Sequence, residues 1–143
     1  SRPETMLDDF IKAGADEITL HSESEGDLRT LLQAVRAAGL RAGLSVKPAT
    51  AVDVALPYLD VLDLVLIMSV EPGFGGQKLM EDTLIKMGQL RRAGFRGVLS
   101  VDGGVKQDNA GMVKRAGATR LVMGTAAFTA PDPRAFLIAV QQA

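Results

Sequence analysis

The chain repeats a simple pattern in which a helical stretch ends in Ala-Gly and a short apolar run follows. The four repeats are Gly14 before Ile18–Leu20, Gly39 before Ala42–Val46, Gly94 before Val98–Val101 and Gly117 before Leu121–Met123. A glycine at a helix end suits the left-handed backbone that closes many helices. Successive glycines lie 25, 55 and 23 residues apart, and the long interval holds one more apolar run, Leu62–Val70. The repeating unit is therefore a helix followed by a strand, with a period of about 25 residues.

The alternation of helices with short, almost wholly apolar strands is typical of parallel strands covered by helices. We predict helices over 4–13, 26–38, 50–58, 80–93, 107–116 and 132–142, and strands over 17–21, 41–46, 62–70, 96–101 and 119–124. Asp108 and Asp132 stand where a capping or first-turn carboxylate helps a helix to begin, and Pro133 suits the first helical turn. Residues 1–143 thus read as a single α/β domain that begins with a helix.

Two architectures accommodate this pattern, and the periodicity alone leaves both open. A doubly wound five-stranded sheet fits 143 residues, although such folds usually open with a strand. A closed (β/α)8 TIM barrel takes about 250 residues, so this chain would supply roughly five of its eight units. The loops that follow the strands decide between the two.

Composition narrows the classes of function. The 16 Lys and Arg nearly balance the 17 Asp and Glu, which argues against general binding to nucleic acid or to an anionic membrane. A hydrophobic fraction of 47% excludes disorder, and the lack of cysteine excludes disulfides and thiolate-bound metals. The longest apolar run, Leu64–Met68, is too short to span a membrane. Residues 1–4 carry no targeting pattern, so we expect a soluble, cytoplasmic protein.

Glycine-rich loops follow three of the predicted strands. They are Glu71–Gln77, Asp102–Gly104 and Gly124–Ala126. Glycine allows backbone N–H groups to converge on one anion, and the carboxyl ends of parallel strands are where α/β folds keep their sites. Any one of these loops alone is most simply a turn, and Asp-Gly is also a hairpin signature. Because a helical pattern follows Asp102–Gly104 instead of a partner strand, we favour one phosphate pocket built from all three loops.

Several single residues are candidates for chemistry at the same strand ends. Asp102 follows the apolar Val101 directly, which makes a catalytic or ligand role about as plausible as a helix cap. His21 is the only histidine, and a lone histidine is more often a hydrogen-bonded structural residue than a ligand. One histidine and no cysteine cannot build a familiar zinc site within this chain. Lys47 ends another strand, and the sequence does not separate a ligand contact from a solvated side chain.

The loops also carry a resemblance to a known family. The run Met68–Lys78, which reads MSVEPGFGGQK, resembles the signature of ribulose-phosphate 3-epimerases. Val101–Val105 is similar to the next motif of that family, and Gly124–Ala126 to its final phosphate loop, with Thr125 where Ser is usual. Ile18–Glu23 and Val46–Thr50 resemble the fourth and fifth strands of the family. The resemblance covers nearly the whole chain in the expected order.

The resemblance implies an incomplete (β/α)8 TIM barrel, strands four to eight, that interconverts D-ribulose 5-phosphate and D-xylulose 5-phosphate through an enediolate. In the family, one Asp takes the C3 proton and a second Asp returns a proton on the other face, with a divalent metal at the enediolate oxygens. Asp102 matches the family residue that is both an acid–base group and a metal ligand. The substrate and phosphate positions match Met68, Gly73, Phe74, Gly75, Gly76, Gly103, Gly104, Gly124 and Thr125.

The same resemblance implies that important parts are missing from the 143 residues. The first three strands of the family would precede Ser1, and with them the second catalytic Asp and three of four metal ligands. The metal of the family is most often zinc, with iron, manganese or cobalt as alternatives. We therefore expect the chain alone to be inactive.

Two other functions stay open at this point. One is a non-catalytic phosphate-binding module that another chain completes, since an open sheet edge promotes association. The other is a hexose-phosphate 3-epimerase of the allulose 6-phosphate type, which would share these loops. In all these cases we expect a sugar-phosphate ligand and a homo-oligomer.

Overall fold

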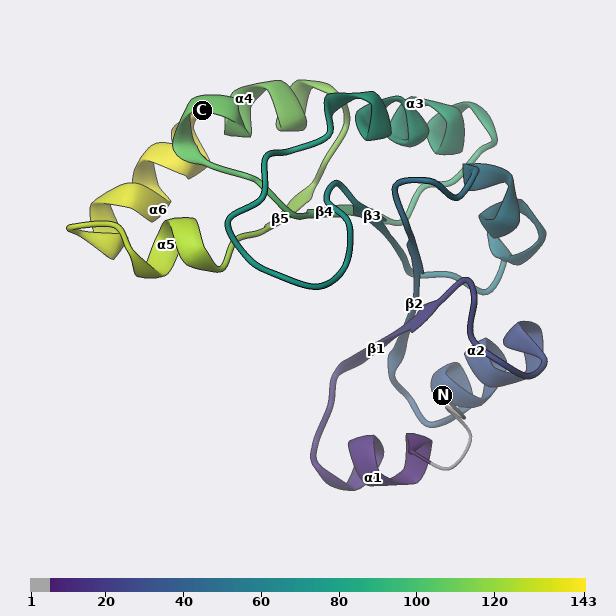
Figure 1. Cartoon of the computed structure of the whole chain (residues 1–143). Coiled ribbons are helices and arrows are strands. Elements are labelled where there is room, and N and C mark those ends of the chain that lie inside the picture. Colours follow the sequence, from purple (N-terminus) through teal and green to yellow (C-terminus); the bar gives the residue numbers. More distant parts are fainter. Residues whose placement is uncertain (1–5) are drawn as a thin grey trace.

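The computed structural model describes residues 6–143 as one parallel sheet with helices outside it (Figure 1). The five strands are β1 (Glu17–His21), β2 (Arg41–Val46), β3 (Leu64–Met68), β4 (Val98–Asp102) and β5 (Arg120–Val122). They lie side by side in chain order, all parallel. A doubly wound sheet would reorder its strands, so sequential order in a curved sheet supports the barrel. The expectation about residues 1–4 and the start of the first helix lie outside the described residues.

The helices follow the predicted order, with three differences. The α-helices are α1 (Leu7–Lys12), α2 (Leu28–Ala37), α3 (Ile85–Arg92), α4 (Gln107–Arg115), α5 (Thr125–Phe128) and α6 (Pro133–Gln142). The predicted helix 50–58 is a 3-10 helix, η2 (Val52–Tyr58), and it contains Pro57. The predicted helix 80–93 begins with a 3-10 turn, η3 (Glu81–Leu84), before α3. The short helix α5 was not predicted. Within residues 6–143, the structure has no helix with both the length and the apolar character to cross a membrane.

Helix ends follow the local chemistry of the chain. Asp132 caps α6 by accepting a hydrogen bond from the Ala135 amide at 3.0 Å, and Pro133 occupies the first turn. Asp108 lies in the first turn of α4 and does not cap it, because Lys106 occupies the capping position. The four glycines of the repeat all have positive φ, between +80° and +116°. The repeat therefore marks real helix ends.

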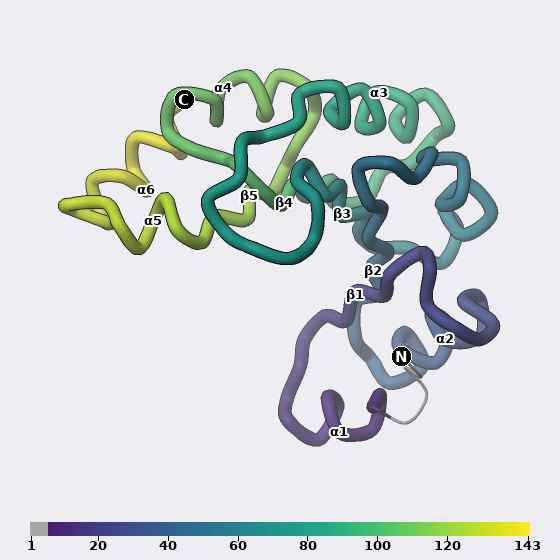
Figure 2. Tube along the Cα trace, viewed as in Figure 1, coloured from purple at the N-terminus to yellow at the C-terminus, as the bar shows by residue number. Residues whose placement is uncertain are grey.

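The two faces of the sheet differ in what they contact. Leu99 and Val101 of β4 are fully buried in the apolar core. Helices α3 and α4 lie along one side of β3, β4 and β5 (Figure 2). Ser100 and Asp102 alternate with Leu99 and Val101, so they point to the opposite, concave face. Gly43 of β2 also lies on this face, where a Cβ would stand 2.4 Å from the Leu64 side chain. The helices therefore cover one face of the sheet, and the opposite face carries Gly43, Ser100 and Asp102.

An ion pair joins the first and last strands. Glu17 of β1 accepts a hydrogen bond from Arg120 of β5, with Oε1 and Nη1 2.5 Å apart, and Arg41 Nη2 lies 3.2 Å from Glu17 Oε2. Strand pairing places Arg120 in the same row as His21, four residues beyond Glu17. The two residues in contact are therefore four residues apart in register over four strand steps, which is one residue per strand. A (β/α)8 barrel of shear 8 has this same stagger.

Candidate active site

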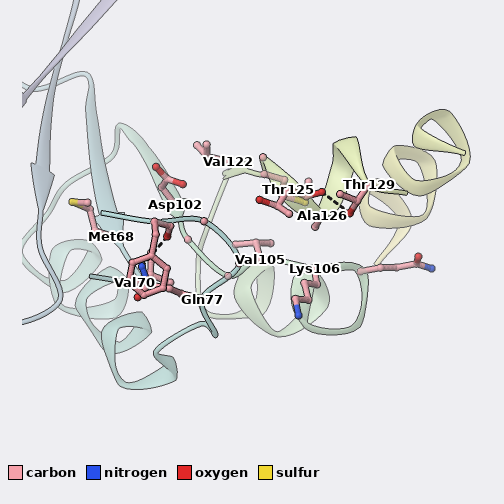
Figure 3. A pocket seen from close by; sticks show the side chains of 18 of the residues that line it. Met68, Val70, Gln77, Asp102, Val105, Lys106, Val122, Thr125, Ala126 and Thr129 are labelled. Atoms are coloured by element: carbon pink, nitrogen blue, oxygen red, sulfur yellow. Dashed lines mark hydrogen bonds between the residues drawn. The ribbon is translucent and has the colours of Figure 1, made fainter. Parts of the chain in front are cut away.

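The three predicted loops meet around one open hollow of about 1110 Å³ at the carboxyl ends of β3, β4 and β5 (Figure 3). All ten residues predicted for the site line it: Met68, Gly73, Phe74, Gly75, Gly76, Asp102, Gly103, Gly104, Gly124 and Thr125. Loops from three neighbouring strands therefore converge on one volume. The geometry required for a shared ligand pocket is present.

Asp102 is the last residue of β4 and lies in the middle of this hollow. Strand pairing sets Met68 of β3 on one side of it and Val122 of β5 on the other (Figure 3). Desolvation by burial raises the pKa of the Asp102 carboxyl above its usual value. Among the described residues, none hydrogen-bonds this carboxylate. A desolvated carboxylate with a raised pKa is a stronger base than one in water, as proton removal from carbon requires.

The loop between β3 and η3 is held in shape from within. Gln77 Nε2 donates to the carbonyl oxygens of Glu71 at 2.7 Å and Phe74 at 2.9 Å. At the base of the loop, the Met80 amide donates to the Ser69 carbonyl at 2.8 Å. The Phe74 side chain at the tip remains 74% exposed. The loop thus has a fixed base and middle and presents an exposed aromatic side chain at the edge of the hollow.

Close packing between the loops explains two of the glycines. Gly103 and Gly104 have φ of +116° and +66°, in the region that other residues rarely adopt. A Cβ on Gly103 would stand 2.4 Å from the Val70 side chain, and one on Gly104 would stand 2.2 Å from the Leu79 backbone nitrogen. Only glycine permits this approach. It brings the loop after β4 directly against the loop after β3.

The third loop closes the hollow at the start of α5. A Cβ on Gly75 would lie 3.0 Å from Thr125 Oγ1, so the loops after β3 and β5 adjoin. Thr125 is the first residue of α5, and its carbonyl accepts from Thr129 Oγ1 at 2.8 Å. The first amides of a helix lack acceptors within the helix and carry partial positive charge. Thr125, Ala126 and the glycine amides together suit an anion such as a phosphate group.

Two other candidates lie outside this hollow. His21 Nδ1 lies 2.8 Å from Ser45 Oγ, so its ring is engaged by a neighbouring strand. Lys47 Nζ lies 3.7 Å from Glu23 Oε2, and Thr50 Oγ1 donates to Glu23 Oε1 at 2.8 Å. These side chains satisfy one another on the β1–β2 side of the sheet.

Two buried polar residues, one next to the hollow and one on the β1–β2 side, were missed at the sequence level. Ser69 is fully buried, and its hydroxyl lies within hydrogen-bond distance of the carbonyls of Asp102 and Gly103. Lys86 of α3 is also buried, and it donates to the carbonyls of Lys47, Pro48 and Thr50. Burial lowers the pKa of the Lys86 ammonium. For Ser69, the one signal in the sequence is a serine among apolar residues at a strand end. Nothing in the sequence indicates the role of Lys86.

The described residues do not fit a metal ion by themselves. No group of three His, Asp or Glu side chains between residues 6 and 143 is placed to hold one. Asp102 is one carboxylate in the hollow, and His21 is engaged with Ser45 on another part of the sheet. A divalent ion needs several such ligands, so a metal site here would take the others from elsewhere.

Comparison with known proteins assigns the family. The model of the ribulose-phosphate 3 epimerase family matches residues 1–128. The chain belongs to this family. Ribulose-phosphate 3-epimerase of Candida glabrata is 43% identical over 131 residues, which are 92% of this chain and 53% of the relative. The Escherichia coli K12 enzyme is also 43% identical, over 89% of this chain and 58% of its own length. This epimerase-family chain thus spans about half the length of the curated relatives it matches.

Solved structures agree with the fold of this epimerase-family chain. KGPDC from Streptococcus mutans superposes with a TM-score of 0.74 at 19% identity, over 96% of this chain and 64% of that one. The 3-hexulose-6-phosphate synthase from Salmonella typhimurium gives 0.73 at 21% identity, over 96% and 65%. At these identities the likeness concerns the fold alone. The five-stranded sheet is therefore part of a TIM-barrel architecture.

Proposed function

We propose that this chain forms the carboxyl-terminal part of a ribulose-phosphate 3-epimerase that converts D-ribulose 5-phosphate to D-xylulose 5-phosphate. The observation that carries the proposal is the position of Asp102. Its carboxylate lies in a hollow that three glycine-rich loops line, with no hydrogen-bond partner among the described residues. A sugar phosphate needs both parts, because the loops bind the phosphate and the carboxylate reaches carbon.

In the proposed step, the Asp102 carboxylate accepts the proton at C3 of the sugar. The C3–H bond breaks and its electron pair forms the C2–C3 double bond, while the π pair of the C2 carbonyl moves onto O2 to give the enediolate. The proton stays on Asp102. A second acid then returns a proton to C3 from the other face, which inverts that carbon. We place this second acid in the strands that, from the sequence resemblance, precede this segment in the family. The raised pKa of Asp102 supports its part, since it brings the base nearer to neutral pH.

The divalent metal of the family, with zinc as the first candidate, stays a prediction for this chain. Asp102 is its proposed ligand here, and the remaining ligands would come from outside the described residues. No step above depends on the metal.

The test is epimerisation in deuterium oxide, followed by proton NMR at C3 of D-ribulose 5-phosphate. The 143-residue chain is assayed alone and after mixing with the part of the Escherichia coli relative that this chain does not match. We expect inversion only in the mixture, because the chain alone supplies one of the two acids. Inversion by the chain alone would contradict the two-part site.

Matched variants then test the role of Asp102. Asp102→Asn should abolish inversion in the mixture, whereas Asp82→Asn, which removes an exposed carboxylate on η3, should leave it unchanged. If the Asp102→Asn mixture keeps its turnover, Asp102 is not the base. A hexose phosphate offered in the same assay separates the pentose enzyme from the allulose 6-phosphate type, and preferential turnover of the hexose would favour the latter.

A non-catalytic role remains the second candidate because the sheet has two edge strands, β1 and β5, in the described part of the chain. Unpaired strand edges favour pairing with another chain. We propose that these edges drive self-association, which size-exclusion chromatography with light scattering would measure. An associated chain that binds phosphate but restores no turnover in the mixture would support a binding module. A stable monomer would contradict the proposed homo-oligomer.

A further inference from the structure

Ser69 occupies an unusual position between β3 and the loop that follows it. It lies directly after Met68, is fully buried and yet carries a hydroxyl. Its amide donates to the Asp102 carbonyl at 2.8 Å, and its own carbonyl accepts from the Met80 amide at 2.8 Å. The backbone of Ser69 therefore joins β4 on one side to the closing end of the loop on the other.

The Ser69 hydroxyl reaches two carbonyl groups of the neighbouring strand end. Its Oγ lies 3.0 Å from the Asp102 oxygen and 2.6 Å from the Gly103 oxygen. These carbonyls begin the two peptide units that link Asp102 to Gly103 and Gly103 to Gly104. A hydroxyl has one proton, and its shorter contact is with the Gly103 carbonyl, so the hydroxyl fixes the Gly103–Gly104 peptide plane. The Ser69 amide, which donates to the Asp102 carbonyl, fixes the Asp102–Gly103 plane.

The direction of those planes decides where the amides point. In a trans peptide the C=O and the N–H point in opposite directions. Since both carbonyls turn toward Ser69, the amides of Gly103 and Gly104 turn away from it. Within the described residues neither amide has an acceptor, and both glycines line the hollow. The two N–H groups are thus free to face an anion there.

We propose that Ser69 is a positioning residue whose amide and hydroxyl together turn the Gly103 and Gly104 amides toward the anion pocket. The proposal deepens the proposed function and rests on its phosphate-binding part. Ser69 does not touch the ligand, because it is sealed beneath the loop. It acts through the two peptides, and its backbone carbonyl also holds the base of the loop through Met80.

Three substitutions at Ser69 separate the hydroxyl from its volume. Ser69→Ala removes the hydroxyl, Ser69→Val removes it and adds bulk, and Ser69→Thr adds nearly the same bulk but keeps it. Ser100→Ala is the matched control, since Ser100 is 1% exposed and its hydroxyl has no partner in the described structure. Circular dichroism melting identifies any variant that fails to fold.

The measurement is titration of the 143-residue chain with inorganic phosphate, followed through the amide NMR signals of Gly103 and Gly104. We expect Ser69→Ala and Ser69→Val to weaken binding about tenfold, the effect of losing about 1.4 kcal/mol of oriented hydrogen bonding. Ser69→Thr should stay within about threefold of the unmodified chain, and Ser100→Ala should not change binding. Equal affinity in Ser69→Ala and the unmodified chain, or equal loss in the Thr and Val variants, would overturn the proposal.

The spectra also separate this proposal from the proposed function. If the unmodified chain binds no phosphate, the proposal that the hollow binds an anion is contradicted. The peptide orientation is then read from the ligand-free spectra alone. Displaced Gly103 and Gly104 signals in the Ala and Val variants, with native positions in the Thr variant, would still support the role of Ser69. Native positions in all three variants would contradict it.

Discussion

The two sides of the strand-end rim use their polar groups in opposite ways. On the β1–β2 side, Lys86 donates to three backbone carbonyls, and Glu23 contacts both Thr50 and Lys47. On the β3–β5 side, Asp102 has no hydrogen-bond partner among the described residues, and burial raises its pKa. On the first side the charged side chains named are paired within the chain, whereas the second side leaves a base and several amides open.

This difference separates structural polar residues from residues of the site. Charged side chains occur on both sides, so charge alone does not locate the site. The distinguishing feature is whether the folded chain already meets the hydrogen-bonding capacity of each group. Polar groups around a hollow that lack hydrogen-bond partners indicate a ligand site. Polar groups that already have partners within the chain indicate a structural role. Substitutions on the two sides should therefore differ in their effects on stability and on phosphate binding.

The largest expected effect comes from packing on the open side. Gly104→Ala should destabilise the chain by about 3 kcal/mol or more, because its Cβ would stand 2.2 Å from the Leu79 backbone nitrogen. Gly39→Ala is the control, since φ is also positive at +80° but no atom lies within 4 Å of its Cβ. It should cost about 1 kcal/mol. Urea unfolding measures both, and equal losses would contradict the close contact between the loops.

Lys86→Met tests the satisfied side. It removes the ammonium donor from the carbonyls of Pro48 and Thr50, and one of two donors from the carbonyl of Lys47, and it should cost about 2 kcal/mol in urea unfolding. Lys114→Met removes a lysine that donates to the carbonyls of Val140 and Gln141 near the surface, and it should cost less than about 1 kcal/mol. Neither should change phosphate affinity, because neither faces the hollow. Loss of phosphate binding in the folded Lys86 variant would join the two sides into one site.

Asp102→Asn should raise the free energy of unfolding, whereas the substitutions above lower it. Because the pKa of Asp102 is raised in the folded state, the folded chain holds this proton more tightly than the unfolded chain does. Ionisation therefore costs stability as pH rises through the raised pKa. At pH 7 the variant should be slightly more stable than the unmodified chain, and the gain should vanish at pH values below the ordinary range of Asp. Unfolding curves at several pH values measure this, and a destabilised variant at pH 7 would indicate a partner for the carboxylate.

The smallest effect concerns the loop above the hollow. Gln77→Ala removes the hydrogen bonds to the carbonyls of Glu71 and Phe74 and should change stability by less than about 0.5 kcal/mol. Phosphate affinity should fall about threefold as the loop loses its fixed shape. Gln89→Ala, at an exposed position on α3, should change neither quantity. Calorimetric titration with phosphate distinguishes the two variants.

Much of the site could be predicted because its signals are local. Glycines directly after apolar strands predicted the three loops, and parallel strands bring such loops to one edge without further information. The strands 17–21 and 41–46 have the predicted bounds. The strands predicted over 62–70, 96–101 and 119–124 are instead Leu64–Met68, Val98–Asp102 and Arg120–Val122, because the apolar pattern does not mark where strand pairing stops. The segment 50–58 was predicted as an α-helix, but Pro57 lacks the amide that an interior turn of such a helix needs.

The missed residues depend on contacts between distant parts of the chain. Ser69 bonds to carbonyls 33 and 34 residues away, and Lys86 to carbonyls 36 to 39 residues away. The Glu17–Arg120 pair spans 103 residues. Neither residue type nor spacing indicates which carbonyl or carboxylate a side chain will meet after folding. Such roles are visible only in three dimensions.

The Glu17–Arg120 pair also bears on the number of strands that a closed barrel of this curvature would have. A side chain that reaches straight across a cylinder meets the wall half-way round its circumference. The pair joins strands that are four steps apart, and twice four steps is the circumference of an eight-membered ring. The contact between β1 and β5 therefore agrees with an eight-stranded barrel.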